Sequence, residues 1–182
     1  IKTNHLGFIL GPKINAGGRL GSSILGTELL IENNQIKALN IAKTLESLNE
    51  NRKILENEMT EQAFKMISNK QINSDFIWIA HENFKSGIAG IIASRLLEKF
   101  NKTCLVISLN KNGIGKGSGR SNSYHNLGKA ISQLAKENLI LKGGGHAKAA
   151  GVTLKTKNIN EAMERLNHIL SDQNRKKKEI SE

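Results

Sequence analysis

The sequence has a single cysteine, Cys104, which excludes an internal disulfide framework and a cysteine-rich zinc site. Cys104 stands in an apolar run, residues 103–107, so we expect a buried structural thiol rather than a nucleophile. No apolar run reaches the roughly 18 residues that a membrane span needs. No signal peptide is recognisable at the start of the chain. We therefore expect a cytoplasmic location and no membrane partner.

Recognisable catalytic motifs are also missing. The histidines are scattered along the chain, and no HxxxH, DxD or DHH pattern brings several ligands onto one metal ion. The nucleophile motif GxSxG is absent, because Gly117-Ser118-Gly119 lacks its spacing. An arrangement in which His146 meets Ser118 or Ser121 stays open. The sequence therefore offers candidate binding residues but no metal site of its own.

Positive charge is what the sequence has in excess. Lysine and arginine number 27 against 16 aspartates and glutamates, which gives a formal net charge of +11. Such a balance favours polyanionic partners, nucleic acid first and an acidic membrane surface second. General lysine enrichment is the alternative explanation, because the lysines are spread along the chain. Aromatic residues make up only 4%, so stacking on nucleic-acid bases should be modest and sequence preference low.

Two glycine runs, residues 115–121 and 142–151, combine an open backbone with cations. Glycine has no side chain to block approach, and successive N–H groups in tight turns form concave anion sites. Arg120 adds a planar fork that matches a phosphate, while the lysines add point charges. We expect the two runs to grip phosphate together. Ordinary turns between strands are the alternative.

The first part of the chain is rich in glycine and contains the only proline, Pro12. Because proline disfavours helical geometry in the residue before it, we expect an irregular loop over residues 1–22. Asn15 and Arg19 would be available there to reach a ligand.

Helices should follow this loop. Ser22 and Ser23 are candidate caps for a short helix over residues 24–31. From Asn33 or Asn34 onwards, apolar residues at steps of three and four predict a helix of about 35 residues. This length, about 50 Å, suits a connector between two domains, although a break near residues 49–51 is an alternative. Arg52 falls on the apolar stripe, and we expect it to extend to solvent rather than to meet an acidic partner.

Strands and helices alternate in the rest of the chain. Residues 75–81 and 103–109 are apolar on both faces and predict buried strands, joined by a helix over residues 88–100. This pattern indicates a right-handed βαβ unit with parallel strands. Ligands in such sheets gather at the carboxyl ends of the strands, where residues 81–86 would lie. We also expect strands at residues 116–120 and 152–155, helices at 127–139 and 160–172, and a solvated basic tail at the end.

Five segments, taken in order, match the motifs of one family. Residues 11–20 look like its GPRINAAGRL segment, and residues 48–56 fit its LNxxRxxxE helix. Residues 87–96 are similar to GVVGIVASRL, residues 117–121 match GSGRS, and residues 144–151 match the hallmark GGHAxAAG. The chain thus resembles the carboxyl-terminal part of the RecJ family of single-stranded-DNA-specific exonucleases, with its DHHA1 domain.

The resemblance implies an α/β protein in which a long connector helix leads into a DHHA1-type domain. That domain would hold a mixed, mainly parallel sheet flanked by helices. Residues 1–70 would form the end of a DHH-side loop and the connector, residues 71–172 the DHHA1 domain and residues 173–182 a basic tail. An upstream DHH domain would carry two Mn²⁺ or Mg²⁺ ions. This chain lacks those ligand motifs, so we expect no metal on it and no activity from it alone, and we expect a monomer.

The same resemblance assigns roles to single residues. Arg19 and His146 are the catalytic candidates, Arg19 near the scissile phosphate and His146 on the wall that faces the metals. The residues expected to bind the strand and its 5′-side phosphate are Asn15, Lys85, Gly117, Ser118, Gly119, Arg120, Ser121, Gly144 and Gly145. The chain departs from the family where Phe84-Lys85-Ser86 replaces tryptophan followed by histidine or asparagine. Phe84 would keep a stacking surface there.

These expectations describe the DNA-binding lobe of a 5′–3′ exonuclease that acts on single-stranded DNA in repair and recombination. Two alternatives stay open. One is the DHHA1 lobe of a phosphodiesterase for oligoribonucleotides or cyclic dinucleotides, although residues 11–20 and 48–56 favour the exonuclease branch. The other is a free-standing nucleic-acid-binding module without activity.

Overall fold

The computed structural model describes residues 2–181, and it describes the side chains of all of these except Lys70 and residues 175–181. The chain divides into two compact units, Ile1–Glu58 and Met59–Glu182. The boundary falls inside the longest helix, α5 (Gln35–Met66). The domain limits expected from the sequence stay a prediction.

The first unit is mostly helical, so the expectation of an irregular loop over residues 1–22 was wrong. Its elements before α5 are α1 (Thr3–His5), the π-helix η1 (Leu6–Leu10), α2 (Gly11–Ile14), α3 (Ala16–Leu20) and α4 (Ile24–Ile31). Gly11 is right-handed helical, with φ −54° and ψ −50°. Pro12 is accommodated because α2 begins directly after the wide π turn. It lies in the first turn of α2, where its missing N–H needs no partner.

The helix α4 has the bounds predicted from the sequence, but Ser23 at its N-cap makes no side-chain capping bond. The helix α5 runs through residues 49–51 without the break that we considered. Its start is capped by Asn34, whose Oδ1 accepts the N–H of Lys37 at 3.1 Å. The prediction of one long helix is therefore confirmed.

Contrary to our expectation, Arg52 does not extend to solvent. Its Nη1 lies 2.6 Å from a carboxylate oxygen of Glu56, one turn further along α5. Its Nε also donates to Oδ1 of Asn49 at 3.3 Å. The two charged side chains are only 12% and 9% exposed, and a charge removed from water to this degree needs a partner.

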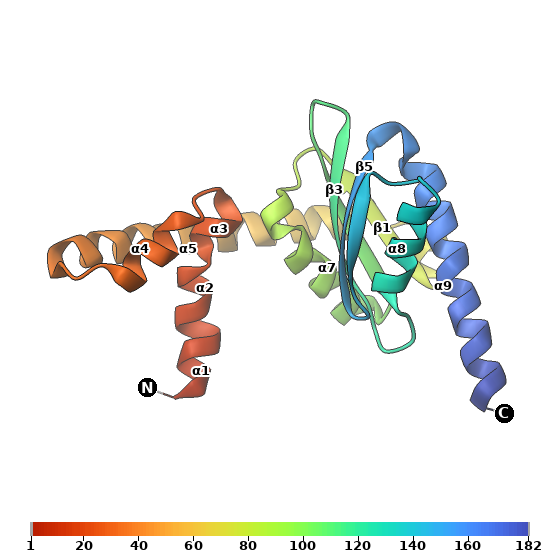
Figure 1. Ribbon diagram of the computed structural model, residues 1–182, viewed down its shortest axis with the longest axis horizontal. Helices are drawn as coiled ribbons and strands as arrows, with labels where there is room; N and C mark the ends of the chain where they lie inside the picture. Colours follow the sequence, from red (N-terminus) through yellow and green to blue (C-terminus); the bar gives the residue numbers. More distant parts are fainter. Residues whose placement is uncertain (1, 182) are drawn as a thin grey trace. The chain divides into compact units, whose positions relative to one another are not determined.

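The second unit is a five-stranded sheet flanked by helices (Figure 1). The strands are β1 (Phe76–His81), β2 (Thr103–Leu109), β3 (Ile114–Arg120), β4 (Lys142–His146) and β5 (Ala149–Lys155), in the order β1-β2-β3-β5-β4. The helices are α6 (Asn69–Ile72), α7 (Ser86–Phe100), α8 (Leu127–Lys136), the 3₁₀-helix η2 (Thr156–Asn158) and α9 (Ile159–Ser181). The helix α9 continues past residue 172, where we expected a tail to begin.

The sheet is mixed, as expected. β1 and β2 are parallel and joined by α7, which confirms the predicted βαβ unit. The other three pairings are antiparallel, so the sheet is not mainly parallel. Short turns at residues 110–113 and 147–148 join β2 to β3 and β4 to β5, and such turns reverse the chain. Most of the second glycine run is therefore strand rather than loop.

The glycines of β3 face the core. A Cβ added at Gly117 would lie 2.6 Å from Cγ1 of Val152, and one added at Gly119 would lie 2.7 Å from Cδ2 of Leu127 in α8. Larger residues at these positions would collide with β5 and α8. These glycines therefore serve close packing, not the approach of a ligand.

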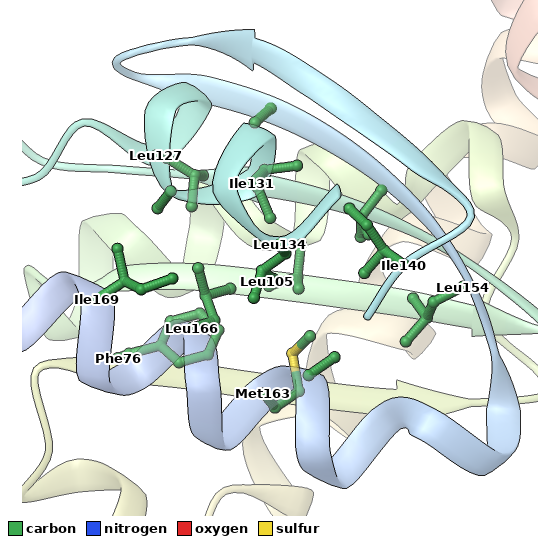
Figure 2. Packing of buried hydrophobic residues seen from close by; sticks show 14 of the residues in the cluster. Phe76, Leu105, Leu127, Ile131, Leu134, Ile140, Leu154, Met163, Leu166 and Ile169 are labelled. Atoms are coloured by element: carbon green, nitrogen blue, oxygen red, sulfur yellow. The ribbon is translucent and has the colours of Figure 1, made fainter. Parts of the chain in front are cut away.

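The helices α8 and α9 cover the face of the sheet that these glycines line. Figure 2 shows Leu127, Ile131 and Leu134 of α8 and Leu166 of α9 packed with Leu105 of β2. All of these side chains are fully buried. Each contributes about 1.5–3 kcal/mol on burial, so this core fixes which face of the sheet stays available for other contacts.

Cys104 is fully buried in β2, and its Sγ donates to the carbonyl of Lys102 at 3.2 Å. Burial raises the pKa of its thiol to about 12. The expectation of a buried structural thiol is confirmed.

The thiol should make stability fall with rising pH. The unfolded thiol ionises near pH 9.0 whereas the folded one holds its proton to about pH 12, so unfolding releases a proton between these values. The free energy of unfolding should decrease there by up to about 1.4 kcal/mol per pH unit from this group. Urea unfolding at pH 8, 9 and 10 measures the slope. The variant Cys104→Ala should lose this part of it, and an identical slope in both proteins would contradict the assignment.

Two glycine substitutions on opposite faces should differ sharply. Gly117→Ala should lower the free energy of unfolding by about 1–3 kcal/mol, because its Cβ overpacks the core. Gly144→Ala should change it by less than about 0.5 kcal/mol, because a Cβ there meets nothing within 4 Å. Thermal and urea unfolding of the pair measure the difference. Equal losses would show that the glycines of β3 do not face the core.

Candidate nucleic-acid interface

The face opposite α8 and α9 carries the polar residues of β3. Because side chains alternate along a strand, Lys116, Ser118 and Arg120 point away from the glycines of the same strand. A Cβ added at Gly90 in α7 would lie 2.9 Å from both Ser118 Oγ and Arg120 Nη2. The helix α7 therefore lies on this second face and leaves room for the two polar side chains at a glycine.

Strand register extends this face across β5 and β4. One row runs from Arg120 through Ala149 to His146, and the next from Ser118 through Gly151 to Gly144. The helix α7 packs against β2 and β3, and Gly151 and His146 are exposed. We call these six residues the glycine-rich face: Arg120, Ala149, His146, Ser118, Gly151 and Gly144. Over β4 and β5 it is a floor of small residues, with a guanidinium and an imidazole along one side.

Arg120 is held in place by its own strand. Its Nη1 donates to Ser118 Oγ at 3.2 Å and to the carbonyl of Gly119 at 2.9 Å. The side chain is half-buried. A guanidinium fixed in this way loses little side-chain freedom when it binds a phosphate. Of the predicted phosphate-binding residues, Arg120 has the geometry that fits the role best.

Ser121 does not fit the phosphate-binding role that we expected. Its side chain is 3% exposed, and its Oγ lies 2.8 Å from Oγ1 of Thr103, which also contacts Nδ1 of His125 at 2.7 Å. Its N–H donates to the carbonyl of Lys148 at 3.0 Å. Both polar groups of Ser121 are thus used to fasten the end of β3. The arrangement in which Ser121 meets His146 has no support, because the hydroxyl points into this buried network.

The glycines of the second run have different tasks. Gly144 is open on the glycine-rich face. Gly145 has φ 151°, and a Cβ there would lie 2.3 Å from the carbonyl oxygen of Ala149, so only glycine fits the hairpin. Gly128 in α8 lies against the carbonyl of the same Gly145, at 2.6 Å from an added Cβ. These close approaches fix the strand end that carries His146.

The remaining candidates lie elsewhere. Lys85 is exposed at the N-cap of α7. Phe84, expected to offer a stacking surface, is only 1% exposed and packs its ring 5.6 Å from that of His81. It cannot stack on a base. Asn15 and Arg19 are both exposed at the start of α3 and within it, in the first unit. The structure therefore brings together the candidates of β3 and β4 only.

The segment that carries β2 to β5 has almost only positive charge. Residues 101–160 contain ten lysines and arginines and one acid, Glu137. Glu137 is bound by Arg165 of α9, with contacts of 2.7 and 2.8 Å, and this hydrogen bonding holds the pKa of its carboxyl at about 2. No acid lies on the described strands β2 to β5 to repel an anion. The electrostatics therefore favour a polyanion on the glycine-rich face.

Neither a metal site nor a membrane span was found in the described part of the chain. No three histidine, cysteine, aspartate or glutamate side chains among the described residues come together in a way that could hold a metal ion. Within the same residues, no helix is long and apolar enough to cross a bilayer. The described residues therefore offer no donor set that fits a metal ion.

The supporting residues were not found from the sequence. Gly90 makes room for Arg120, and Thr103 and His125 hold Ser121. Gly90 lies in the segment 87–96, which matches a family motif, but nothing in that motif indicates contact with β3. Thr103 and His125 carry no local signal, because their contacts join positions 18 and 22 residues apart.

Residues 55–172 match the family model of the DHHA1 domain. Among curated proteins, the chain is similar to the single-stranded-DNA-specific exonuclease RecJ of Dickeya dadantii, with 34% identity over 175 residues. It is also similar to RecJ of Bacillus subtilis, with 32% identity over 165 residues. The matches cover 93% and 90% of this chain but 30% and 21% of those proteins. The chain thus spans less than a third of the length of these relatives.

Solved structures agree with this result. RecJ of Thermus thermophilus, in complex with Mg²⁺ or with Mn²⁺, matches the chain with a TM-score of 0.82 at 26% identity. The match covers 94% of this chain and 26% of the Mg²⁺-bound one. The resemblance predicted from the motifs is confirmed. The chain belongs to the DHHA1 domain family, and over nearly its whole length it is similar to the part of the RecJ exonucleases that carries this domain.

Proposed function

We propose that this chain is the nucleic-acid-binding lobe of a 5′–3′ exonuclease that degrades single-stranded DNA. The setting would be DNA repair and recombination in the cytoplasm, with a monomeric enzyme. The observation that carries the proposal is the glycine-rich face, a floor of small residues beside an oriented arginine on a sheet whose described strands carry no acidic residue. The similarity to RecJ supports single-stranded DNA as the polyanion.

Within this proposal, Arg120 and Ser118 hold the 5′-side phosphate of the strand. The small residues Gly144 and Gly151 let the sugar–phosphate backbone lie close to the sheet. His146 forms the end of the wall and faces the reacting phosphate. Arg19 and Asn15 lie in the first unit. Their proposed roles as further contacts to the strand therefore rest on the resemblance alone. Ser121 and Gly145 act through the backbone that they fix.

The hydrolytic step would need residues outside this chain. Divalent Mn²⁺ or Mg²⁺ would be held by an upstream DHH domain, where it would activate the attacking water. Support for such a neighbouring domain comes from the apolar surface of the first unit. Its most exposed large apolar residues are Phe8, Ile36, Leu30 and Ile31, with exposed fractions of 82%, 73%, 70% and 70%. Apolar exposure of this extent marks a contact surface, and we propose that the upstream part of the same protein covers it.

The two alternatives make different demands on the same face. We expect a phosphodiesterase for dinucleotides to need a short pocket that closes around two bases, whereas the glycine-rich face is open at Gly151 and Gly144 of β5 and β4. A module without activity would bind DNA equally well whatever lies upstream. We prefer the exonuclease because the similarity to RecJ includes the first unit as well as the sheet.

Activity of the whole gene product that contains this chain tests the proposal. With Mn²⁺, it should release nucleotides from the 5′ end of a 5′-labelled single strand much faster than from a duplex or a dinucleotide. Arg120→Ala should lower kcat/KM by about 10- to 100-fold, the loss expected for a charge-assisted phosphate contact. Arg120→Lys should recover only part of it, because a point charge cannot reproduce the fork.

The control is Arg165→Ala, which also removes one guanidinium but lies on α9, with its partner Glu137. It should leave kcat/KM within about twofold. Unchanged digestion by Arg120→Ala would remove Arg120 from the site. A preference for dinucleotides over long strands would favour the phosphodiesterase instead.

A further inference from the structure

A second row of cations crosses the same face of the sheet. Lys116 of β3 pairs with Thr153 of β5, which pairs with Lys142 of β4. These residues alternate with Gly117 and Gly143, whose added Cβ atoms would strike the core at Val152 and Ile131. Lys116, Thr153 and Lys142 therefore share the face of Arg120 and His146. Lys116 and Lys142 stand in the two glycine runs, but none of the three belongs to the family motifs or to the predicted binding residues.

This row is open and uncompensated. Lys116 and Lys142 are exposed, and neither forms an ion pair within the described part of the chain. The row continues onto Ser108 of β2, whose hydroxyl donates to the carbonyl of Phe84, the residue before Lys85. The backbone of Lys85, a third exposed lysine, therefore lies next to this row. Two or three ammonium groups around a threonine hydroxyl form a site suited to a phosphate.

The distance between the two rows decides which ligand can use both. Arg120 and Lys116 are four residues apart on one strand, so their Cα atoms are about 13 Å apart at 3.3 Å per residue. Between them lies the row of Ser118, Gly151 and Gly144. The helix α7 covers this row at Ser118, but Gly151 and Gly144 present no side chain that would block a backbone over β5 and β4. A spacing of this size exceeds that between adjacent phosphates of one strand. A mononucleotide has one phosphate for the two rows, and we expect a dinucleotide held at Arg120 to gain little from the second row, whereas a longer strand can use both.

We propose that Lys116, Thr153 and Lys142 form a second phosphate subsite, which binds a different phosphate of the single strand held at Arg120. This inference rests on the proposed function and deepens it. The two rows together make the sheet a track for a polynucleotide. The second subsite selects for length, because only a strand of several nucleotides gains from it.

The experiment compares two double variants of this chain that remove the same charge. Lys116→Ala/Lys142→Ala empties the second row, and Lys129→Ala/Lys136→Ala removes two exposed lysines of α8, on the other side of the sheet. Fluorescence anisotropy at several salt concentrations gives the affinity for a 5′-phosphorylated thymidine 12-mer. NMR titration gives the affinity for the 5′-phosphorylated dinucleotide. Arg120→Ala is measured in both assays.

The row variant should weaken binding of the 12-mer on the order of tenfold and reduce the slope of log K against log salt by about 1.4, or 0.7 for each lost contact. It should leave dinucleotide affinity unchanged, and the α8 variant should do less to the 12-mer. Equal losses of 12-mer affinity in the two double variants would overturn the second subsite while leaving the proposed function intact. If Arg120→Ala changed neither affinity, the proposed function itself would fail, and the subsite with it.

Discussion

The alternation of side chains along β3 is the constraint on which the rest of the second unit depends. The core side of this strand has no room for a Cβ at Gly117 or Gly119, because β5 and α8 lie at 2.6–2.7 Å from that position. The glycines that suggested an anion-binding loop are thus needed for packing. Once they are fixed inward, the residues between them must point outward. The cations reach the open face as a geometric consequence of the way the core is filled.

The apolar patterns predicted the elements of this unit well. Continuous apolar runs predicted β1 and β2, and the helix between them fixed their parallel pairing. The strand β4 was missed because KGGGH has no apolar alternation, and its pairing with β5 comes from a distant segment. The helical start of the chain was missed for a local reason. Proline normally excludes the helix before it, and a π turn before Pro12 removes that conflict.

The candidate site was predictable as a set of residues but not as a surface. The motif with Arg120 was recognised, yet the sequence treats Arg120 and Ser121 as equal neighbours. The structure separates them, since one lies on the open face and the other is fastened to Thr103. Phe84 failed in the same way, because an aromatic residue at a strand end can point either way. Strand register makes this distinction, and register depends on pairings between distant segments.

The two units differ in how much of their apolar surface each one buries. The sheet of the second unit is covered by α8 and α9 on one face and by α7 on part of the other, and it leaves small and charged residues exposed. The first unit buries few large side chains, Leu45 among them, and leaves Phe8 and Ile36 exposed. An exposed cation is well hydrated, whereas several exposed large apolar side chains mark a contact surface. These surfaces agree with the proposal that the sheet binds a soluble polyanion and that the helices before it contact protein.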